Sequence, residues 1–293
     1  MTIEDFLNYL RYERNCSERT VQSYGDDLQG FETYFKNQEN QLSWESVDSD
    51  VIRDWMESMM DKGNNATSIK RRLSALRSFY RFALARGLVE RNPVSAVENP
   101  KSAKPLPQFL RESEIDQLLD EVEWGENYNN VRARTIILLF YETGIRLAEL
   151  IGLNDGDIDW ENRQLKVTGK RNKQRIVPFG PEVASVLEDY MKRRDEQVAR
   201  KSEALFLTAK GLRMNHNQVR YDVKKNLTKV STLKKRTPHV LRHTFATAML
   251  NNGAGLESVK KLLGHESLET TEIYTHTTFE QLKKVYENAH PRS

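Results

Sequence analysis

Six side chains from residue 146 onward have the types that cleavage of a phosphodiester by a protein nucleophile requires. An arginine guanidinium holds two non-bridging phosphate oxygens and stays protonated. A tyrosine phenol can bond covalently to phosphorus when a positive pocket holds it, and a lysine or an imidazole can give the leaving alkoxide its proton. The residues with these properties are Arg146, Lys170, His239, Arg242, His265 and Tyr274. Together they predict phosphoryl transfer through a covalent intermediate.

The local sequence predicts which elements carry these side chains. Arg146 lies near the expected N-terminus of a short helix, and Glu149, three residues later, can orient its guanidinium. Lys170 lies in a turn between two expected strands, where a long side chain can project into a cleft. His239 and Arg242 share one face at the start of another helix.

Each of these features also has a structural interpretation when it is taken alone. An Arg-x-x-Glu pair is most often a surface ion pair, and a basic hairpin turn is usually solvated. A His-x-x-Arg pair on a helix is usually a cap or an ion-pair partner. A lone tyrosine is usually half-buried and structural, although the neighbours of Tyr274 are polar. None of these residues is decisive by itself.

Composition describes a globular chain in a reducing compartment. Of the 293 residues, 38% are hydrophobic and 30% are charged. No apolar run approaches the length of a membrane span, and the acidic, amphipathic N-terminus does not resemble a signal peptide. The single cysteine, Cys16, excludes internal disulfides and cysteine-cluster metal sites. We therefore expect a cytoplasmic protein without membrane insertion.

The basic residues are clustered, which a surface that follows phosphates requires. The net charge of +3 is too small to indicate nucleic acid binding by itself. However, the first hundred residues carry more acidic than basic side chains, so the basic excess lies in the rest of the chain. The clusters are Lys70–Arg72, Lys170–Arg175, Arg193–Arg194 and Lys224–Arg236.

The first hundred residues predict a helical domain. Apolar residues recur at helical spacing over residues 3–13, 17–35, 49–61 and 66–86. In the last of these helices Lys70, Arg77 and Arg81 share the face opposite the apolar stripe, with serines between them. Small hydroxyl side chains between positive charges let a helix approach a sugar-phosphate backbone, although a solvated basic face is the alternative.

The remaining sequence predicts a linker and a second, mostly helical domain. Residues 91–109 contain four prolines and no sustained periodicity, as is typical of an extended linker. Helices are expected at 112–122, 131–142, 181–194, 215–225, 240–251, 256–263 and 279–289, with short strands at 158–160, 164–167 and 175–178. The fold class is therefore mainly α with a small three-stranded antiparallel sheet, divided into domains 1–100 and 108–293.

Four motifs resemble those of the tyrosine recombinases, or phage integrase family. They are TGIRLAELIGL, GKRNKQRIVP, HVLRHTFAT and LLGHESLETTEIYTH, with Lys170 24 residues after Arg146 and Tyr274 nine residues after His265. The stretches SERTVQSYGDDLQGF and KRRLSALRSFYRFA resemble the SAM-like core-binding domain of that family. The resemblance therefore covers nearly the whole chain.

The resemblance implies a role for each residue of the motifs. Tyr274 would attack the scissile phosphate, forming a 3′-phosphotyrosyl bond and releasing a 5′-hydroxyl. Arg146 and Arg242 would clamp the non-bridging oxygens. Lys170 would be the general acid, while His239 would assist proton transfer.

Two further roles and the cofactor requirement follow from the same resemblance. His265 would donate a hydrogen bond to the transition state, and Glu149 would support Arg146. Because transesterification keeps the bond energy and arginines neutralise the phosphate, no metal, ATP or other cofactor is expected.

The resemblance also implies partners. The partner would be double-stranded DNA at a specific recombination site, bound by a homo- or hetero-tetramer that includes a related recombinase. The helix at 279–289 would dock on a neighbouring subunit or on its own chain. The expected DNA contacts are Lys70, Arg77, Arg81, Lys224, Lys225, Lys234 and Lys235.

The compact length and the ending VYENAHPRS resemble the Xer branch of the family, which resolves chromosome dimers. That branch would add a septal DNA translocase as an activator. Integrases and transposases of mobile elements can be equally compact, so they remain an alternative. A type IB topoisomerase with the same chemistry and a non-enzymatic DNA-binding regulator are the other two.

Overall fold

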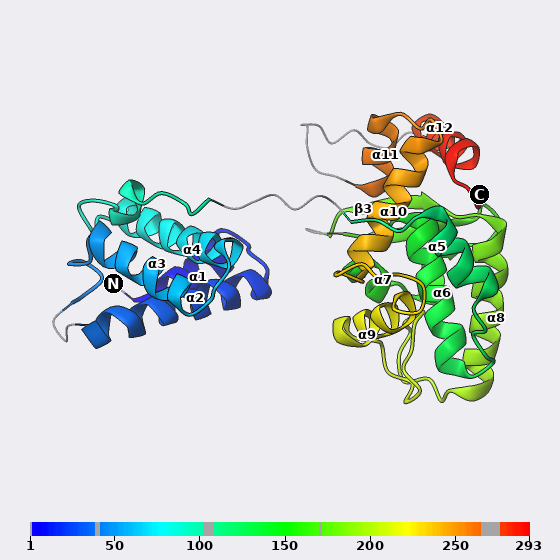
Figure 1. Cartoon of the computed structure of the whole chain (residues 1–293), viewed down its shortest axis with the longest axis horizontal. Coiled ribbons are helices and arrows are strands. Elements are labelled where there is room, and N and C mark those ends of the chain that lie inside the picture. Colours follow the sequence, from blue (N-terminus) through cyan, green and yellow to red (C-terminus); the bar gives the residue numbers. More distant parts are fainter. Residues whose placement is uncertain (1, 39–41, 102–107, 170–171, 265–275) are drawn as a thin grey trace. The chain divides into compact units, whose positions relative to one another are not determined.

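The chain forms two units, Met1–Pro105 and Leu106–Ser293, each with its own hydrophobic core (Figure 1). The computed structural model describes residues 2–38, 42–101, 108–169, 172–264 and 276–293, and of residues 276–280 it describes the backbone only. The predicted fold class is confirmed, because helices dominate both units and the second contains one three-stranded antiparallel sheet.

The N-terminal unit is helical throughout. Its elements are α1 (Ile3–Asn8), the π-helical turn η1 (Tyr9–Glu13), α2 (Glu18–Gln38), α3 (Ser49–Asp61), α4 (Ala66–Ala85) and the 3₁₀ turn η2 (Pro93–Ala96). Side-chain caps define where two of the helices begin. Asp48 accepts hydrogen bonds from the first turn of α3, and Asn65 accepts one from the first turn of α4.

Aromatic side chains fill the core of this unit. The rings of Trp44 and Phe79 lie 4.4 Å apart, and those of Phe31 and Trp55 lie 4.8 Å apart. The buried Tyr80 hydroxyl donates to the carbonyl of Trp44 at 2.9 Å, so its polar atom is also satisfied.

Part of the predicted linker belongs to this core. Residues 93–96, which we expected to be extended, form η2, and Val94 and Val97 are buried. Asn92 caps the turn by accepting from the main-chain N–H of Val94. The proline at the first position of the turn has the φ that such a turn needs, so Pro93 here starts a helical turn.

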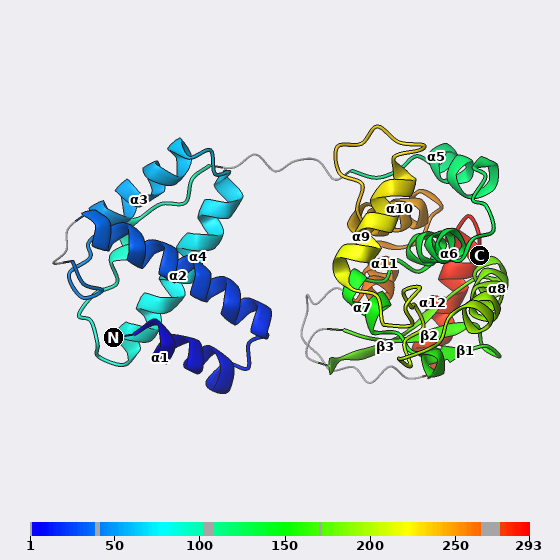
Figure 2. The same cartoon turned by 90° about the horizontal axis from the view of Figure 1, so that it is seen from below.

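The second unit is built around α6 (Tyr128–Thr143), which is buried along most of its length and packs against α8, α9 and α10 (Figure 2). The other elements are α5 (Glu112–Asp116), η3 (Gln117–Glu121), α7 (Leu147–Gly152), η4 (Asp155–Asp157), α8 (Pro181–Gln197), α9 (His216–Leu227), α10 (Pro238–Asn251), α11 (Leu256–Leu263) and α12 (His276–Ala289). No helix in the described part of the chain is long and apolar enough to cross a membrane.

The sheet has the order β1-β2-β3, with strands Ile158–Asp159, Gln164–Thr168 and Gln174–Pro178. Both pairings are antiparallel, and Leu165 lies opposite Ile158 on one side and Val177 on the other. Because side chains alternate along a strand, Leu165, Val167 and Val177 face the core while Lys166 and Ile176 face solvent.

Helix α12 docks on its own chain. It contacts α10, α11 and β3, and Leu282, Tyr286 and Ala289 are buried. The Tyr286 hydroxyl donates to Oε2 of Glu142 at 3.1 Å. After the helix, Arg292 pairs with three acidic side chains, Asp116, Asp120 and Glu182. Of the two expected docking modes, the structure therefore contains the one within a single chain.

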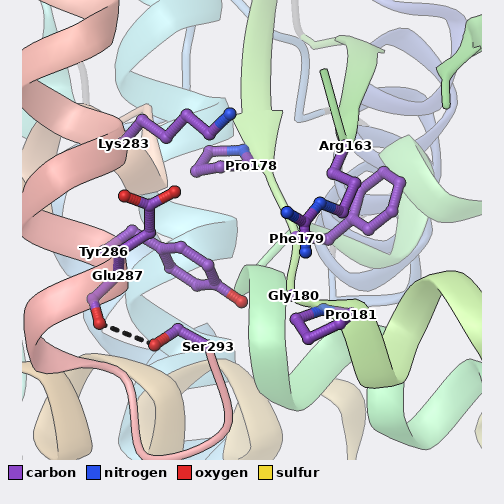
Figure 3. Close-up of a pocket in the computed structure, with 9 residues that line it drawn as sticks. All are labelled: Arg163, Pro178, Phe179, Gly180, Pro181, Lys283, Tyr286, Glu287 and Ser293. Atoms are coloured by element: carbon purple, nitrogen blue, oxygen red, sulfur yellow. Dashed lines mark hydrogen bonds between the residues drawn. The ribbon is translucent and has the colours of Figure 1, made fainter. Parts of the chain in front are cut away.

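A cavity of about 200 Å³ lies beside this docked helix (Figure 3). Lys283, Tyr286 and Glu287 of α12 form one side, and Arg163 and the segment from Pro178 to Pro181 form the other. The Lys283 ammonium donates to the carbonyl of Asn162 at 3.1 Å. None of the described residues predicted for catalysis lines this cavity.

The Glu142 carboxyl is fully buried under α12. Burial raises its pKa to about 8, against the effects of its hydrogen bonds with Gly180 and Tyr286. Of the nearby charges, Glu182 raises this pKa and Arg292 lowers it. Its other oxygen, Oε1, has no hydrogen-bond partner in the described part of the chain. The neutral acid is therefore the form that this site favours at pH 7.

We predict that Glu142→Gln makes the protein more resistant to alkaline pH. A folded-state pKa above the unfolded value of 4.5 gives stability that is complete below pH 4.5 and is lost as pH rises through about 8. As pH rises from 4.5 to about 8, ionisation of this carboxyl in the unfolded state lowers the wild-type free energy of unfolding by up to about 1.4 kcal/mol per pH unit. A neutral amide has no such effect. Urea unfolding at pH 6 and pH 9 measures the difference. Glu188→Gln, an exposed change on α8, should keep the wild-type slope, and the same slope in Glu142→Gln would contradict the prediction.

Candidate active site

Arg146 is the N-cap residue of α7, directly after the sharp turn that ends α6. That turn depends on Gly144, whose φ of +59° lies in the left-handed region. A Cβ atom there would lie 2.5 Å from the Phe245 ring and 2.8 Å from Leu263. The Gly144 carbonyl accepts a hydrogen bond from Arg242 at 2.5 Å. The glycine thus allows α10 and α11 to pack closely against the start of α7.

Glu149 is hydrogen-bonded to Arg146 at two points. One carboxylate oxygen accepts from the main-chain N–H of Arg146 at 2.7 Å, and the other accepts from its guanidinium at 2.8 Å. Glu149 is 2% exposed, and burial alone would raise the pKa of its carboxyl. Hydrogen bonds and charge from Arg175, followed by hydrogen bonds from Arg146, outweigh burial and lower this pKa to about 2. The carboxylate is therefore ionised at any physiological pH.

Arg242 brings a second guanidinium to the same place from α10. It is 7% exposed and donates to the carbonyls of Gly144 at 2.5 Å and of Leu263 at 2.7 Å. Burial first, and then the positive charges of Arg146 and Arg175, lower the pKa of Arg242 to about 10. The side chain remains protonated at pH 7, in a site whose positive charge would favour a bound anion.

His239 lies one turn before Arg242 on α10, and its side chain is open to solvent. Partial loss of hydration, followed by the charges of His243, Arg242, Arg220 and Arg146, lowers the pKa of His239 below its ordinary 6.5. The imidazole is therefore mainly neutral at pH 7, and a neutral imidazole can accept a proton.

Three of the predicted catalytic residues, Lys170, His265 and Tyr274, lie outside the described residues, so their roles remain predictions. Both segments that flank residues 170–171 are described. The main-chain N–H of Gly169 donates to the carbonyl of Lys173 at 2.7 Å and closes the β2–β3 hairpin around residue 170.

The predicted DNA contacts differ in their surroundings. Arg81 is exposed, whereas Lys70 is only partly exposed. The guanidinium of Arg77 donates to the Val97 carbonyl at 2.7 Å and to the Asn99 side chain at 2.8 Å. Arg77 therefore holds the segment after η2 against α4, a structural contact that the sequence did not indicate. In the second unit the predicted contacts Lys224, Lys225, Lys234 and Lys235 are all exposed.

Sequence reasoning counted Arg175 only as part of the basic cluster Lys170–Arg175, whereas the structure places it facing the core, beside Glu149. Its guanidinium bonds both oxygens of Glu149, at 2.6 and 2.9 Å. A signal was present, because residues 175 and 177 of a strand face the same side and Val177 is clearly a core residue. An arginine that faces a core needs a carboxylate or main-chain partner.

No group of three or more histidine, cysteine, aspartate or glutamate side chains placed to hold a metal ion occurs in the described ranges. Arg146, Glu149 and Arg242 are joined with Arg175 of β3 by hydrogen bonds, directly or through the carbonyls of residues 262–264, into one positive site. His239 lies one turn before Arg242 on α10. Such a site can bind a phosphate and stabilise additional negative charge on it.

Comparisons with known proteins agree over almost the whole chain. The family model described as phage integrase family matches residues 108–281, and that of the phage integrase N-terminal SAM-like domain matches residues 3–87. Tyrosine recombinase XerC of Chlorobaculum tepidum is 38% identical, with 99% of this chain and 94% of that protein covered. Tyrosine recombinase XerD of Oceanobacillus iheyensis is 36% identical, with coverage of 99% and 98%.

Two solved structures have the same fold at low identity. XerH site-specific recombinase bound to palindromic difH substrate has a TM-score of 0.72 and 23% identity, with 97% of this chain and 83% of that chain covered. The Tn1549 transposon integrase in complex with transposon right end DNA has a TM-score of 0.73 and 21% identity, with coverage of 98% and 99%.

Gly144→Ala should lower the free energy of unfolding of the second unit more than the same substitution at another glycine with positive φ. An alanine with positive φ costs about 1–2 kcal/mol, and the contact with Phe245 adds about 1–3 kcal/mol of overpacking. Gly253→Ala is the matched control, because Gly253 has φ +88° and no atom lies within 4 Å of the position that its new methyl group would take. Urea unfolding of both variants measures the difference, and equal losses would show that close packing at Gly144 is unimportant.

Proposed function

The chain belongs to the phage integrase family of tyrosine recombinases, and on that premise we propose that it cuts and rejoins double-stranded DNA at a specific site through Tyr274. The observation that carries the proposal is the pairing of Arg146 and Arg242. Their segments are far apart in the chain, yet the two guanidiniums bond consecutive main-chain carbonyls, Arg242 that of Leu263 at 2.7 Å and Arg146 that of Gly264 at 2.5 Å. Two guanidiniums held together in this way suit the two non-bridging oxygens of a phosphodiester.

In the proposed reaction the phenol oxygen of Tyr274 attacks the phosphorus. A phosphotyrosyl bond to the 3′ side forms as the bond to the 5′ oxygen breaks, and the 5′ oxygen leaves as a hydroxyl after taking a proton from Lys170. Attack by a 5′-hydroxyl of another strand reverses these steps and regenerates the phenol. One phosphoester replaces another at each step, so no external energy source enters the balance.

The other residues act on charge and protons. Arg146 and Arg242 stabilise the charge that develops on the non-bridging oxygens of the pentacovalent phosphorus. His239, mainly neutral at pH 7, assists transfer of the phenol proton, and His265 donates a hydrogen bond to the transition state. Glu149 holds Arg146 in place without contacting the phosphate.

DNA binding is proposed through the basic residues of both units. The exposed Lys224, Lys225, Lys234 and Lys235 would contact the DNA backbone beside the active site. In the N-terminal unit Lys70, Arg77 and Arg81 would follow the same backbone from α4. The assembly would be a tetramer on two DNA sites, alone or with a related recombinase.

The biological role that we favour is chromosome dimer resolution in the cytoplasm, activated by a septal DNA translocase. Identities of 36–38% to curated XerC and XerD proteins over 99% of this chain support it. Integration or transposition of a mobile element uses the same chemistry and is the second candidate, because compact integrases share this domain arrangement.

Covalent capture tests the reaction. Wild-type protein is incubated in EDTA with a library of randomised duplexes nicked so that the released strand diffuses away, and DNA that stays bound in detergent is sequenced. We expect wild type to retain one enriched sequence and Tyr274→Phe to retain none, because phenylalanine has no nucleophile. Tyr221→Phe, at an exposed tyrosine of α9, should behave as wild type.

The enriched DNA separates the alternatives. Recombination between two copies of the recovered sequence supports the proposal, whereas unselective capture with relaxation of supercoiled plasmid indicates a type IB topoisomerase. Absence of any covalent DNA with wild type would leave a DNA-binding regulator and would refute the proposed reaction.

Lys170→Ala tests the general acid. On an ordinary substrate we expect cleavage to slow by about 100-fold or more, because the 5′ oxygen leaves without its proton donor. A substrate with sulfur in place of that oxygen has a better leaving group, so the same variant should lose little rate on it. Lys210→Ala, at an exposed lysine outside the basic clusters, is the control and should cleave both substrates normally. Equal losses on the two substrates would remove the assignment.

A further inference from the structure

We propose that Arg175 is a positioning residue that orients the Glu149 carboxylate and, through it, sets Arg146 and the end of α11 for the reaction. The inference rests on the proposed function and concerns a residue to which neither the motifs nor the comparisons assign a role. Three kinds of observation carry it: the geometry of Arg175, the elements that it joins, and the electrostatics of Glu149.

The geometry of Arg175 is that of a fully engaged side chain. Its side chain is 9% exposed. Two guanidinium nitrogens bond separate oxygens of Glu149, at 2.6 and 2.9 Å, and Nε donates to the Leu262 carbonyl at 3.1 Å. This bidentate arrangement fixes the plane of the carboxylate, which a single hydrogen bond does not. Because Arg175 faces the core, we expect it to act without touching DNA.

Arg175 also joins the segments on which the predicted catalytic residues lie. It belongs to β3, directly after the hairpin that contains Lys170, and Glu149 belongs to α7 with Arg146. The Glu149 carboxylate also packs on Gly169, where a Cβ atom would lie 3.3 Å from Oε1. The carboxylate therefore contacts both the segment that precedes residue 170 and the residue that caps α7.

The end of α11 is held by the same set of arginines. Three consecutive carbonyls each accept from a different guanidinium: Leu262 from Arg175 at 3.1 Å, Leu263 from Arg242 at 2.7 Å, and Gly264 from Arg146 at 2.5 Å. The last carbonyls of a helix lack partners within the helix and carry partial negative charge, so cations stabilise them. His265 follows Gly264 immediately, so this contact fixes the point from which the nucleophile segment begins.

The electrostatics of Glu149 depend on Arg175 more than on Arg146. Burial raises the pKa of this carboxyl, and the contributions of Arg175 are the largest of those that lower it. The charged groups that face Glu149 in the described part of the chain are Arg146 beside it on α7, Arg175 on β3 and Arg242 on α10. Without Arg175 the effect of burial is opposed mainly by Arg146, so the folded-state pKa moves upward. Below that higher pKa the carboxyl is protonated and can no longer hold Arg146 by two ionic hydrogen bonds.

The test compares the pH dependence of cleavage in Arg175→Met, Arg175→Lys and Glu149→Gln, using DNA recovered with the wild-type protein. We expect Arg175→Met to cleave about 100-fold more slowly at pH 7, as a small misplacement of a catalytic group does. Its rate should also fall on the acid side at a higher pH than the wild-type rate. Arg175→Lys, which retains the charge, should move this acid limb back toward the wild-type position.

Two further measurements separate positioning from a purely structural role. The double variant Arg175→Met with Glu149→Gln has no carboxyl at this position, so the additional acid limb should disappear. The dissociation constant for DNA should change far less than the cleavage rate in Arg175→Met, because the arginine faces the core and acts on the phosphate only through its charge. A uniform loss of rate at every pH, or an acid limb that persists in the double variant, would overturn the proposal.

A readout without activity keeps this inference distinct from the proposed function. Carbon NMR of glutamate carboxyls follows Glu149 directly, with Glu149→Gln identifying its signal. We expect no titration above pH 4 in wild type and a midpoint above the ordinary 4.5 in Arg175→Met. An unchanged midpoint refutes the role of Arg175 even where wild type cleaves DNA. A failure of wild type to form covalent DNA, with the midpoint shifted as expected, refutes the proposed reaction and not the linkage between Arg175 and Glu149.

Discussion

The buried carboxylate of Glu149 is the interaction on which the rest of the proposed active site depends. Arg146 and Arg175 both bond this carboxylate. The charges of Arg146, Arg175 and Glu149 all act on the pKa of Arg242. One negative charge among three positive ones leaves an excess that burial makes costly. Main-chain carbonyls of Gly144 and residues 262–264 meet part of that excess with partial charges only. The excess is two positive charges, so a bound phosphodiester with one negative charge would reduce it to one, and the second negative charge of the pentacovalent transition state would cancel the rest.

The charged side chains of this site come from segments that lie far apart in the chain, and packing of the second unit brings these segments together. The buried helix α6 ends at Gly144, and the absence of a side chain there lets Phe245 and Leu263 come within contact of the turn. Arg242 of α10 donates hydrogen bonds to the carbonyls of Gly144 and Leu263, which lie on either side of this contact. The sheet contributes Arg175 at an inward-facing position of β3. The site is therefore stabilised by packing around it as much as by its own hydrogen bonds.

Local features of the sequence were sufficient to predict most of the elements. The helical spacing of apolar residues over 17–35, 49–61 and 66–86 acts over a few residues, so it predicts these helices without knowledge of the fold. The pairing of Arg146 with Glu149 was predictable for the same reason, since both lie in one helical turn. Arg175 and Glu149 are 26 residues apart, and nothing local specifies that they meet. Likewise, Pro93 looked like part of an extended linker because its burial depends on contacts with the rest of the unit.

The docking of α12 shows how an attachment within one chain bears on the proposed tetramer. The helix is held by a hydrogen bond between Tyr286 and a mainly neutral Glu142, by apolar packing of Leu282, and by the ion pairs of Arg292 beyond its end. None of these contacts uses a residue proposed for catalysis. A neighbouring copy carries the same acceptor groups, so α12 docked there would form the same contacts with a different connection. Docking of α12 on a neighbouring copy would therefore have nearly the same contact energy as docking on its own chain. The segment that joins α11 to α12 would then decide between the two. That segment contains Tyr274, so any constraint which the proposed assembly places on α12 would bear on the segment of the proposed nucleophile.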